Sequence, residues 1–344
     1  MSSLKASKRP AGTLSVLAVV GLLLFPVITV LIALAVGRIW IPPVTIFQSV
    51  AHQFGAAYDV GVQTGKVLWS IRFPRILLAL LTGAGLSVAG CAFQSLFSNP
   101  LATPDTLGVA SGASFGAALG ILLGLGQLGI QLAALVFGIT AVALTVLAGT
   151  GRGRSVNTVV LAGIMIGSLF TALVSLVKFT ADTESELPAI TYWLMGSLNG
   201  KSYSSLAVGA PLILGGLLVL FLLRWRMNLL PLSDDEARAS GTNIQALRAV
   251  TVLCATAMTA SCVSMCGQVG WVGLLVPHIC RMRFGNNHLA LIPASICVGA
   301  GFMVVVDTIA RSVSAAEIPI SVLTAIIGAP FFVMLMRKSG GWRL

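Results

Sequence analysis

Long apolar runs, separated by short polar segments, recur from Leu14 almost to the end of the chain. A bilayer core about 30 Å thick takes roughly 20 apolar residues per helix, and most of these runs have about that length. The pattern predicts about ten helices, at Leu14–Val36, Ile76–Leu96, Thr106–Leu123, Leu128–Leu147, Asn157–Thr180, Ser204–Leu223, Ala246–Met265, Trp271–Cys280, Leu289–Ala310 and Ile318–Met336. The eighth of these helices is too short to span the membrane alone.

Composition supports this interpretation. The 344 residues are 57% hydrophobic and 9% charged, whereas an ordinary soluble protein has about 25% charged residues. A membrane β-barrel would show short alternating segments instead of long apolar runs. We therefore expect an all-α integral membrane protein, with one transmembrane domain over residues 14–338 between two cytoplasmic tails, residues 1–13 and 339–344.

The distribution of basic residues predicts the orientation. Lys5, Lys8 and Arg9 precede the first apolar run, and placing them in the cytoplasm puts four further basic pairs inside: Arg152 and Arg154, Arg224 and Arg226, Arg281 and Arg283, and Arg337 and Lys338. This agrees with the positive-inside rule. The net charge of +11 thus reflects topology, and because the charges form no single stripe we expect no nucleic-acid partner.

Polar groups and helix breakers interrupt the apolar sequence between Gly270 and Phe331: Pro277-His278, Asp307, Arg311, Glu317-Ile318-Pro319 and Gly328-Ala329-Pro330. In hydrocarbon, an unsatisfied polar group costs several kcal/mol, so such residues persist only where neighbouring helices or a water-filled path satisfy them. A transport pathway is the function that this pattern favours.

The order and spacing of these elements resemble the FecCD permeases of ATP-driven importers of iron chelates, haem and vitamin B12. The resemblance recurs at Arg72-Phe73-Pro74-Arg75, at Gln94 with Asn99-Pro100-Leu101-Ala102, at Leu107 to Ala113, at Trp193 to Leu198 and at Ala237 to Gly241, and covers most of the chain beyond residue 60. It implies the fold of the vitamin B12 importer permease, a type II ABC importer, in the bacterial inner membrane. It also implies import of a metal chelate, with a ferric siderophore expected first and haem or cobalamin as alternatives.

The resemblance further implies three partners and no cofactor. They are a cytoplasmic ABC ATPase dimer, an extracytoplasmic binding protein, and a second permease copy or a related permease chain. In the family, arginines at the positions of Arg72, Arg75 and Arg311 dock acidic residues of the binding protein, and guanidinium groups suit such bidentate bonds. Alternatively, Arg72 and Arg75 anchor a helix at lipid headgroups, and Arg311 pairs with Asp307 one turn earlier.

The largest hydrophilic segment on the predicted inner side covers residues 228–248. Ser233 can cap a short helix whose positive end favours acidic residues, and Gly241 can end it, so we expect two short helices around a glycine. In the resembled family this loop couples the permease to the ATPase, which makes Ser233, Asp234, Asp235, Glu236, Ala237, Arg238 and Gly241 candidate coupling residues. The alternative is a solvated connector.

This chain offers no nucleotide site of its own. Gly196 to Ser202 is one residue shorter than a phosphate-binding loop and falls on the predicted outer side. We therefore expect no enzymatic activity, and ATP hydrolysis on a separate subunit.

Two further sets of residues are candidates for packing and for the pathway. Glycines recur every fourth residue in the third predicted helix, a spacing that lets another helix approach closely: Gly108, Gly112, Gly116, Gly120 and Gly124. Because one copy shows no polar-lined pore, we expect the passage between two permease subunits. The candidate lining is on the fifth helix, at Met165, Ser168, Thr171 and Ser175.

Rival hypotheses rest on other residues. An ion-gradient-driven secondary transporter would use Asp307, Lys178 or His278 as its titrating group, although we expect His278 to bond a backbone carbonyl. An intramembrane enzyme is the weaker alternative, because this sequence contains none of the catalytic motifs expected of one. Cys262 and Cys266, four residues apart and followed by His278 and Cys280, suggest a soft-metal site, but buried cysteine usually acts as a small hydrophobe, so no metal is expected.

Overall fold

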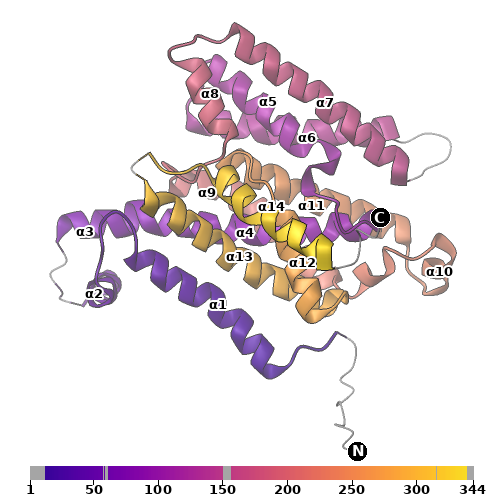
Figure 1. The fold of residues 1–344 in the computed structure, drawn as a ribbon, viewed down its shortest axis with the longest axis horizontal. Coiled ribbons are helices and arrows are strands. Elements are labelled where there is room, and N and C mark those ends of the chain that lie inside the picture. Colours follow the sequence, from indigo (N-terminus) through magenta and orange to yellow (C-terminus); the bar gives the residue numbers. More distant parts are fainter. Residues whose placement is uncertain (1–11, 57, 59–60, 150–155, 315, 339–344) are drawn as a thin grey trace, which may run out of the picture.

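The computed structural model describes residues 12–56, 58, 61–149, 156–314 and 316–338, except for the side chains at 156, 157, 234, 235, 238 and 335–338. All regular elements in these ranges are helical (Figure 1). They are α1 (Val16–Ala35), α2 (Pro43–Gln53), α3 (Val62–Lys66), η1 (Val67–Arg72), α4 (Phe73–Leu96), η2 (Pro104–Leu107), α5 (Val109–Leu122), α6 (Gln127–Gly149), α7 (Val156–Thr180), α8 (Glu186–Leu194), α9 (Tyr203–Leu223), η3 (Arg226–Leu229), α10 (Asp234–Ala239), α11 (Ile244–Cys266), α12 (Val272–Phe284), α13 (His288–Val313) and α14 (Ile320–Lys338).

Seven of the described helical segments are long and apolar enough to cross a bilayer, and α5 and α14 contain shorter apolar stretches. The prediction of an all-helical membrane protein is confirmed, while the number of ten helices stays a prediction. The predicted ranges lie close to α1, α5, α6, α7, α9, α11, α12, α13 and α14, within a few residues at each end. The tails at residues 1–11 and 339–344, and Arg152 and Arg154, lie outside the described residues.

Helix α4 lies at the centre of the bundle, with α13, α11, α9 and α12 packed around it (Figure 1). Helices α5 to α8 form a layer on one side of this core, and α1 lies along the other side. The most apolar stretch of the segment Val62–Leu96 is 83% buried, whereas that of α1 is 17% buried. The apolar side chains of α1 therefore face outward, as in a helix that faces lipid.

Glycines permit the close crossings of α4. A Cβ atom at Gly90 would lie 1.8 Å from the carbonyl oxygen of Gly273 on α12, and one at Gly83 would lie 2.1 Å from that of Gly299 on α13. At both crossings the backbones touch directly, as small residues allow in membrane helices.

The second predicted helix begins earlier than expected. Instead of starting at Ile76, it continues upstream through a π-helical turn, η1, and a short helix, α3. The wide turn immediately precedes Pro74, whose missing amide interrupts the usual hydrogen-bond ladder. Arg72 and Arg75 consequently lie inside one continuous helical segment, Val62–Leu96.

The third predicted helix is divided. Gly108 adopts a left-handed conformation (φ 77°) between η2 and α5, and Gly124 (φ 66°) lies beyond the end of α5. Gly108 and Gly124 thus lie outside α5, although Gly108 still lies close to another helix, since a Cβ atom there would be 3.1 Å from the Gly167 amide nitrogen on α7. Within α5, a Cβ atom at Gly112, Gly116 or Gly120 would lie 2.6, 2.3 or 3.2 Å from an atom of α6, so these glycines allow the two helices to pack closely. Their importance for assembly stays a prediction.

Two short helices, α2 and α8, were not expected. Helix α8 begins in the acidic segment after α7, where the Asp182 carboxylate accepts hydrogen bonds from the Ser185 amide (2.8 Å) and hydroxyl (2.7 Å). The Glu186 carboxylate accepts from the Asp182 amide (3.0 Å). Asp182 and Glu186 thus organise the start of α8.

Candidate functional site

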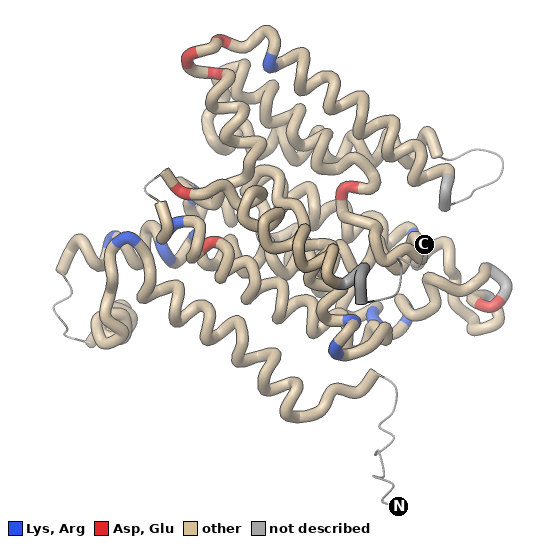
Figure 2. Tube along the Cα trace, in the orientation of Figure 1, with Lys and Arg blue, Asp and Glu red and all other residues tan. Residues whose placement is uncertain are grey.

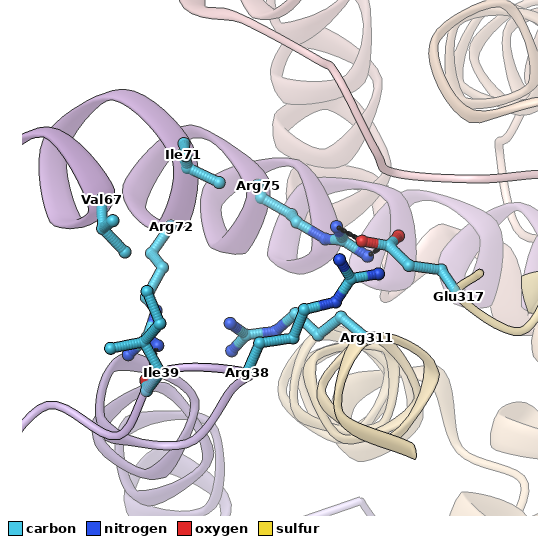
Figure 3. Close-up of a pocket in the computed structure, with 8 residues that line it drawn as sticks. All are labelled: Arg38, Ile39, Val67, Ile71, Arg72, Arg75, Arg311 and Glu317. Carbon is cyan, nitrogen blue, oxygen red and sulfur yellow. Dashed lines mark hydrogen bonds and ion pairs between the residues drawn. The ribbon is translucent and has the colours of Figure 1, made fainter. Parts of the chain in front are cut away.

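A cluster of buried charges joins α4, α13 and the loop before α14. Arg75 Nε donates to Asp307 Oδ1 (2.8 Å), and its two Nη atoms donate to the Glu317 carboxylate oxygens at 3.1 and 3.0 Å (Figure 3). Arg311 Nε lies 3.6 Å from Asp307 Oδ2. Asp307 therefore faces two guanidinium groups, and the alternative pairing of Arg311 with Asp307 is confirmed.

The other arginine bonds in this cluster go to the end of α1. Arg72 donates to the carbonyls of Leu34, Ala35 (3.2 Å) and Ile39, and Arg311 donates to that of Ala33. The last carbonyls of a helix have no partner within it and carry partial negative charge. The two guanidinium groups therefore cap α1.

This geometry changes the picture of the three predicted docking residues. Arg72, Arg75 and Arg311 are only 3%, 5% and 7% exposed, and each bonds to groups of the chain itself. Their role in docking stays a prediction. We call this end of the bundle, defined by the three arginines and Glu317, the arginine end.

One residue at the arginine end was not anticipated. Exposed Arg38, just after α1, lines a cavity of about 230 Å³ together with Arg72, Arg75, Arg311 and Glu317 (Figure 3). Of the four arginines, Arg75 and Arg311 pair with the carboxylates of Asp307 and Glu317. In the sequence, the only signal was a basic residue directly after the first apolar run.

Helix α10 lies at the opposite end of the bundle, in the segment predicted to couple to an ATPase (Figure 1). Ser233 caps it: the Glu236 amide donates to Ser233 Oγ (3.4 Å), while the Ser233 amide and hydroxyl donate to Glu236 Oε2 (3.1 and 2.8 Å). This is a reciprocal capping box. Hydrogen bonds from the Ser233 hydroxyl and amide lower the pKa of the exposed Glu236 carboxyl below its ordinary value.

The rest of the coupling segment differs in part from expectation. Gly241 (φ 72°) ends the turn after α10, and Asn243 then caps α11 through the Ala246 amide (3.0 Å). The second expected short helix is thus the start of the long helix α11. Ala237 is buried, and the side chains of Asp234, Asp235 and Arg238 lie outside the described part of the chain.

A partly buried polar chain links this segment to the core. Asn228 Oδ1 accepts hydrogen bonds from the His288 amide (2.9 Å) and from His288 Nδ1 (3.0 Å), and His288 Nε2 lies 2.5 Å from Ser95 Oγ on α4. Asn228 Nδ2 donates to the Trp225 carbonyl (3.1 Å), which fixes the orientation of the amide and places the proton on His288 Nδ1. The sequence gave no reason to select His288.

The four candidate lining residues of α7 are all exposed in this chain. The hydroxyls of Ser168, Thr171 and Ser175 donate to carbonyls one turn earlier at 2.8, 2.9 and 3.1 Å. Ser168 and Thr171 line a cavity of about 380 Å³ that also includes Asp105 and Ser111. Hydroxyls bonded in this way present a polar surface without a spare donor, so they suit passage better than tight binding. Met165 lies on the same exposed helix.

The remaining candidates are His278 and the cysteines. Among the described residues, His278 Nδ1 has no hydrogen-bond partner, so the expected bond to a carbonyl is not found there, and its ring meets that of Phe332. The Cys266 thiol donates to the Cys262 carbonyl (2.8 Å). No group of three or more His, Cys, Asp or Glu side chains in the described ranges could hold a metal ion.

Comparison with known proteins identifies the family. Residues 23–338 match the FecCD transport family. The chain belongs to this family. It is 40% identical to the molybdate import system permease MolB of Haemophilus influenzae over 92% of this chain and 94% of that protein. It is 37% identical over 80% of this chain and 83% of a Helicobacter pylori protein whose name assigns it to permeases of iron chelatin transport.

A solved structure agrees with this assignment. An ABC transporter described as of metal-chelate type, in an inward-facing conformation, has a chain that superimposes with a TM-score of 0.84 at 39% identity, covering 93% of this chain and 98% of that one. The FecCD chain is thus a multi-pass membrane permease of a type II ABC importer, and this family supplies the membrane component of such importers, not the catalytic one. Membership implies a separate ATPase, a binding protein and a second permease.

Proposed function

We propose that this FecCD chain pairs with a second permease chain to form the passage of an importer in the bacterial inner membrane. The arginine end would face the binding protein outside, and α10 would face the ATPase dimer in the cytoplasm. The observation that carries this orientation is the placement of a cavity lined by four arginines and of an exposed, capped helix at opposite ends of the bundle. Figure 2 shows charged residues gathered mainly towards these ends, with long stretches of helix between them that hold few.

In this proposal, both termini are cytoplasmic, and α7 faces the partner permease. Exposed Met165, Ser168, Thr171 and Ser175 then line the passage, because their helix is among the least buried of the long helices. The partly buried chain from Asn228 through His288 to Ser95 connects the coupling segment to α13 and α4. Movement of α10 would therefore reach the core through hydrogen bonds as well as through the backbone.

The docking hypothesis takes a refined form. Arg75 already holds two carboxylates, and Arg72 already caps α1. Arg38 is the exposed arginine of this cavity. We propose that an acidic residue of the binding protein pairs with Arg38, while Arg72, Arg75 and Arg311 supply the positive field behind it.

The proposed cargo is a metal chelate, with a ferric siderophore as the first candidate and haem or cobalamin as alternatives. A chelatin-transport relative at 37% identity and the metal-chelate type of the structural neighbour support this class. Molybdate is the second candidate, because a permease named for molybdate import is 40% identical along nearly its whole length.

Affinity purification from native membranes tests the assembly. Co-purification of an ABC ATPase and a second permease chain supports the proposal. A fully folded chain that is recovered alone would contradict it and would favour an ion-driven carrier. Uptake of radioactive molybdate and of a radioactive ferric siderophore, measured in cells that lack other importers for each, then identifies the cargo.

The docking step has its own test. Arg38→Glu should abolish uptake and leave ATPase association intact, because the substitution reverses charge at an exposed position. Lys66→Glu is the matched control, since Lys66 is also exposed near the arginine end and does not line the cavity. Normal uptake by the Arg38→Glu protein would refute docking at this residue. Charge reversal at Arg72 or Arg75 is unsuitable, because both side chains are buried and the protein would misfold.

A further inference from the structure

A second cavity at the arginine end has no place in the proposed mechanism. It has a volume of about 400 Å³ and lies among the α5–α6 connection, α8, the loop from α8 to α9, and the end of α11. The hydrogen bond from the Tyr203 hydroxyl to the Trp69 carbonyl (2.8 Å) joins the start of α9 to η1, which places this loop near the arginine end.

The walls of this cavity are held rigidly. The Ser197 amide donates to the carbonyl of Cys266 (2.8 Å), and Gln131 Nε2 donates to the carbonyl of Ser205 (2.9 Å). Gly196 and Gly267 have positive φ angles (both 74°), and a Cβ atom at Gly267 would lie 2.3 Å from the carbonyl oxygen of Trp193. These contacts fix the loop onto the end of α11, so the cavity is preformed.

The lining is rich in hydrogen-bond donors. The side chains of Gln127, Gln131, Ser197, Asn199 and Lys201 contribute donors to it, whereas the hydroxyls of Tyr192 and Ser264 already donate to Ser197 Oγ and to the Ser261 carbonyl. Ser197 Oγ accepts hydrogen bonds from the Tyr192 hydroxyl (3.2 Å) and the Asn199 amide (3.0 Å), so its own hydrogen is free to point at a ligand. None of the described lining residues is an aspartate or glutamate.

Lys201 is the only charged residue in this lining, as the structure describes it. Its side chain is half-buried and forms no hydrogen bond or ion pair with the described residues. The neighbouring Cys266 thiol donates to a carbonyl and therefore remains neutral. Burial lowers the pKa of Lys201 below its ordinary value, as expected for an ammonium group that lacks a nearby anion.

We propose that this cavity is an anion site, in which Lys201 and the surrounding amide and hydroxyl donors bind a group with several oxygen acceptors, such as phosphate, sulfate or molybdate. An ammonium group and neutral donors together provide the charge-assisted hydrogen bonds that such a group requires. The anion could be free in solution or could be the phosphate of a lipid headgroup, since both present the same oxygen atoms. The site is separate from docking and coupling and does not depend on the identity of the cargo.

Binding by the purified permease tests this proposal without any transport measurement. The protein is titrated with sodium sulfate and with sodium molybdate in a phosphate-free maltoside detergent at constant ionic strength. The readouts are the thermal unfolding midpoint and the tryptophan emission, since Trp193 lines the cavity. We expect a saturable response in the wild type and in Lys178→Gln, and at least a tenfold weaker affinity in Lys201→Gln. Lys178 is a matched control because it is a half-buried lysine near the same end, outside this lining.

A second arm distinguishes the source of the anion. Native mass spectrometry after reconstitution with phosphatidylglycerol should show a lipid retained by the wild type and by Lys178→Gln, and lost from Lys201→Gln, if a headgroup fills the site. A response to free anions alone assigns the site to a soluble ligand. If Lys201→Gln matches the wild type in both arms, the proposal is overturned.

Discussion

Removing the charge of Asp307 should destabilise the permease strongly. The Asp307→Asn substitution is nearly isosteric, so it changes charge with little change in shape. Asp307 is 1% exposed, and its carboxylate lies 2.8 Å from Arg75 Nε and 3.6 Å from Arg311 Nε. The variant would leave two buried guanidinium groups with only Glu317 between them.

The expected magnitude follows from these contacts. At an effective dielectric constant of about 20, two unit charges about 4 Å apart attract by about 4 kcal/mol, and Asp307 has two such partners. Burying the Asp307 carboxylate costs several kcal/mol of hydration free energy, and the Asp307→Asn protein avoids this cost. The avoided cost offsets part of the lost attraction. Breaking a buried pair by removing one partner typically costs about 3–5 kcal/mol, and we expect a loss in this range.

The assay is equilibrium unfolding of the purified protein in mild detergent, followed by loss of helical circular dichroism on titration with a denaturing detergent. Glu184→Gln is the control, because Glu184 is an exposed carboxylate near the same end of the bundle. The double variant Arg75→Met with Asp307→Asn should lose less stability than the sum of the two single variants, since one buried charge is removed with its partner. A loss below about 0.5 kcal/mol in Asp307→Asn would refute the structural role of this pair and would revive Asp307 as a titrating group.

Two further predictions concern a helix crossing and a helix cap. Gly90→Ala should lower the yield of the folded permease and its stability by about 1–3 kcal/mol or more, because the added Cβ atom would overlap the Gly273 carbonyl. Gly215→Ala is the control and should be neutral, because the space around Gly215 is open. Equal melting temperatures of the Gly90→Ala and Gly215→Ala proteins would contradict this account. Ser233→Ala should remove about 1 kcal/mol of capping from α10 and reduce uptake and ATPase stimulation, while the unfolding of the bundle stays unchanged. Normal uptake and ATPase stimulation by the Ser233→Ala protein would show that contact with the ATPase, and not the cap, maintains the helical conformation of α10.

Much of the fold was accessible from the sequence, since apolar runs determine where helices cross a membrane. The predicted helix Leu128–Leu147 and the observed α6 (Gln127–Gly149) differ by only one or two residues at their ends. The start of the second helix was missed, because Pro74 and two arginines are usual signs of a helix boundary. The arginines continue the helix in this case because Asp307, Glu317 and the end of α1 neutralise them, and these groups are distant in the sequence.

The candidate sites show the same limit. Ser233 was identified as a cap because the capping signal lies within four residues, and the structure contains that cap. The burial of Arg72 and Arg75 could not be read from their neighbours in the sequence, because it depends on which helices pack against α4. Lys201 gave no signal beyond its place in a segment that resembles a phosphate-binding loop, since its cavity is assembled from α6, α8 and α11. A cap formed by neighbouring residues can be recognised in the sequence, whereas a cavity formed by distant helices cannot.

The capping of α1 by distant arginines also constrains how the protein is made. Ribosomes make α1 long before α13, yet the Ala33 carbonyl at the end of α1 receives its hydrogen bond from Arg311, 278 residues later in the chain. Arg72 reaches the neighbouring carbonyls much sooner. Gly37 leaves room for both guanidinium groups, since a Cβ atom there would lie 2.8 Å from Arg72 Nη2 and 3.0 Å from Arg311 Nη1. The end of α1 is therefore capped in two steps, by Arg72 soon after α1 is made and by Arg311 only when α13 is present, and a chain that stops before α13 lacks the second bond.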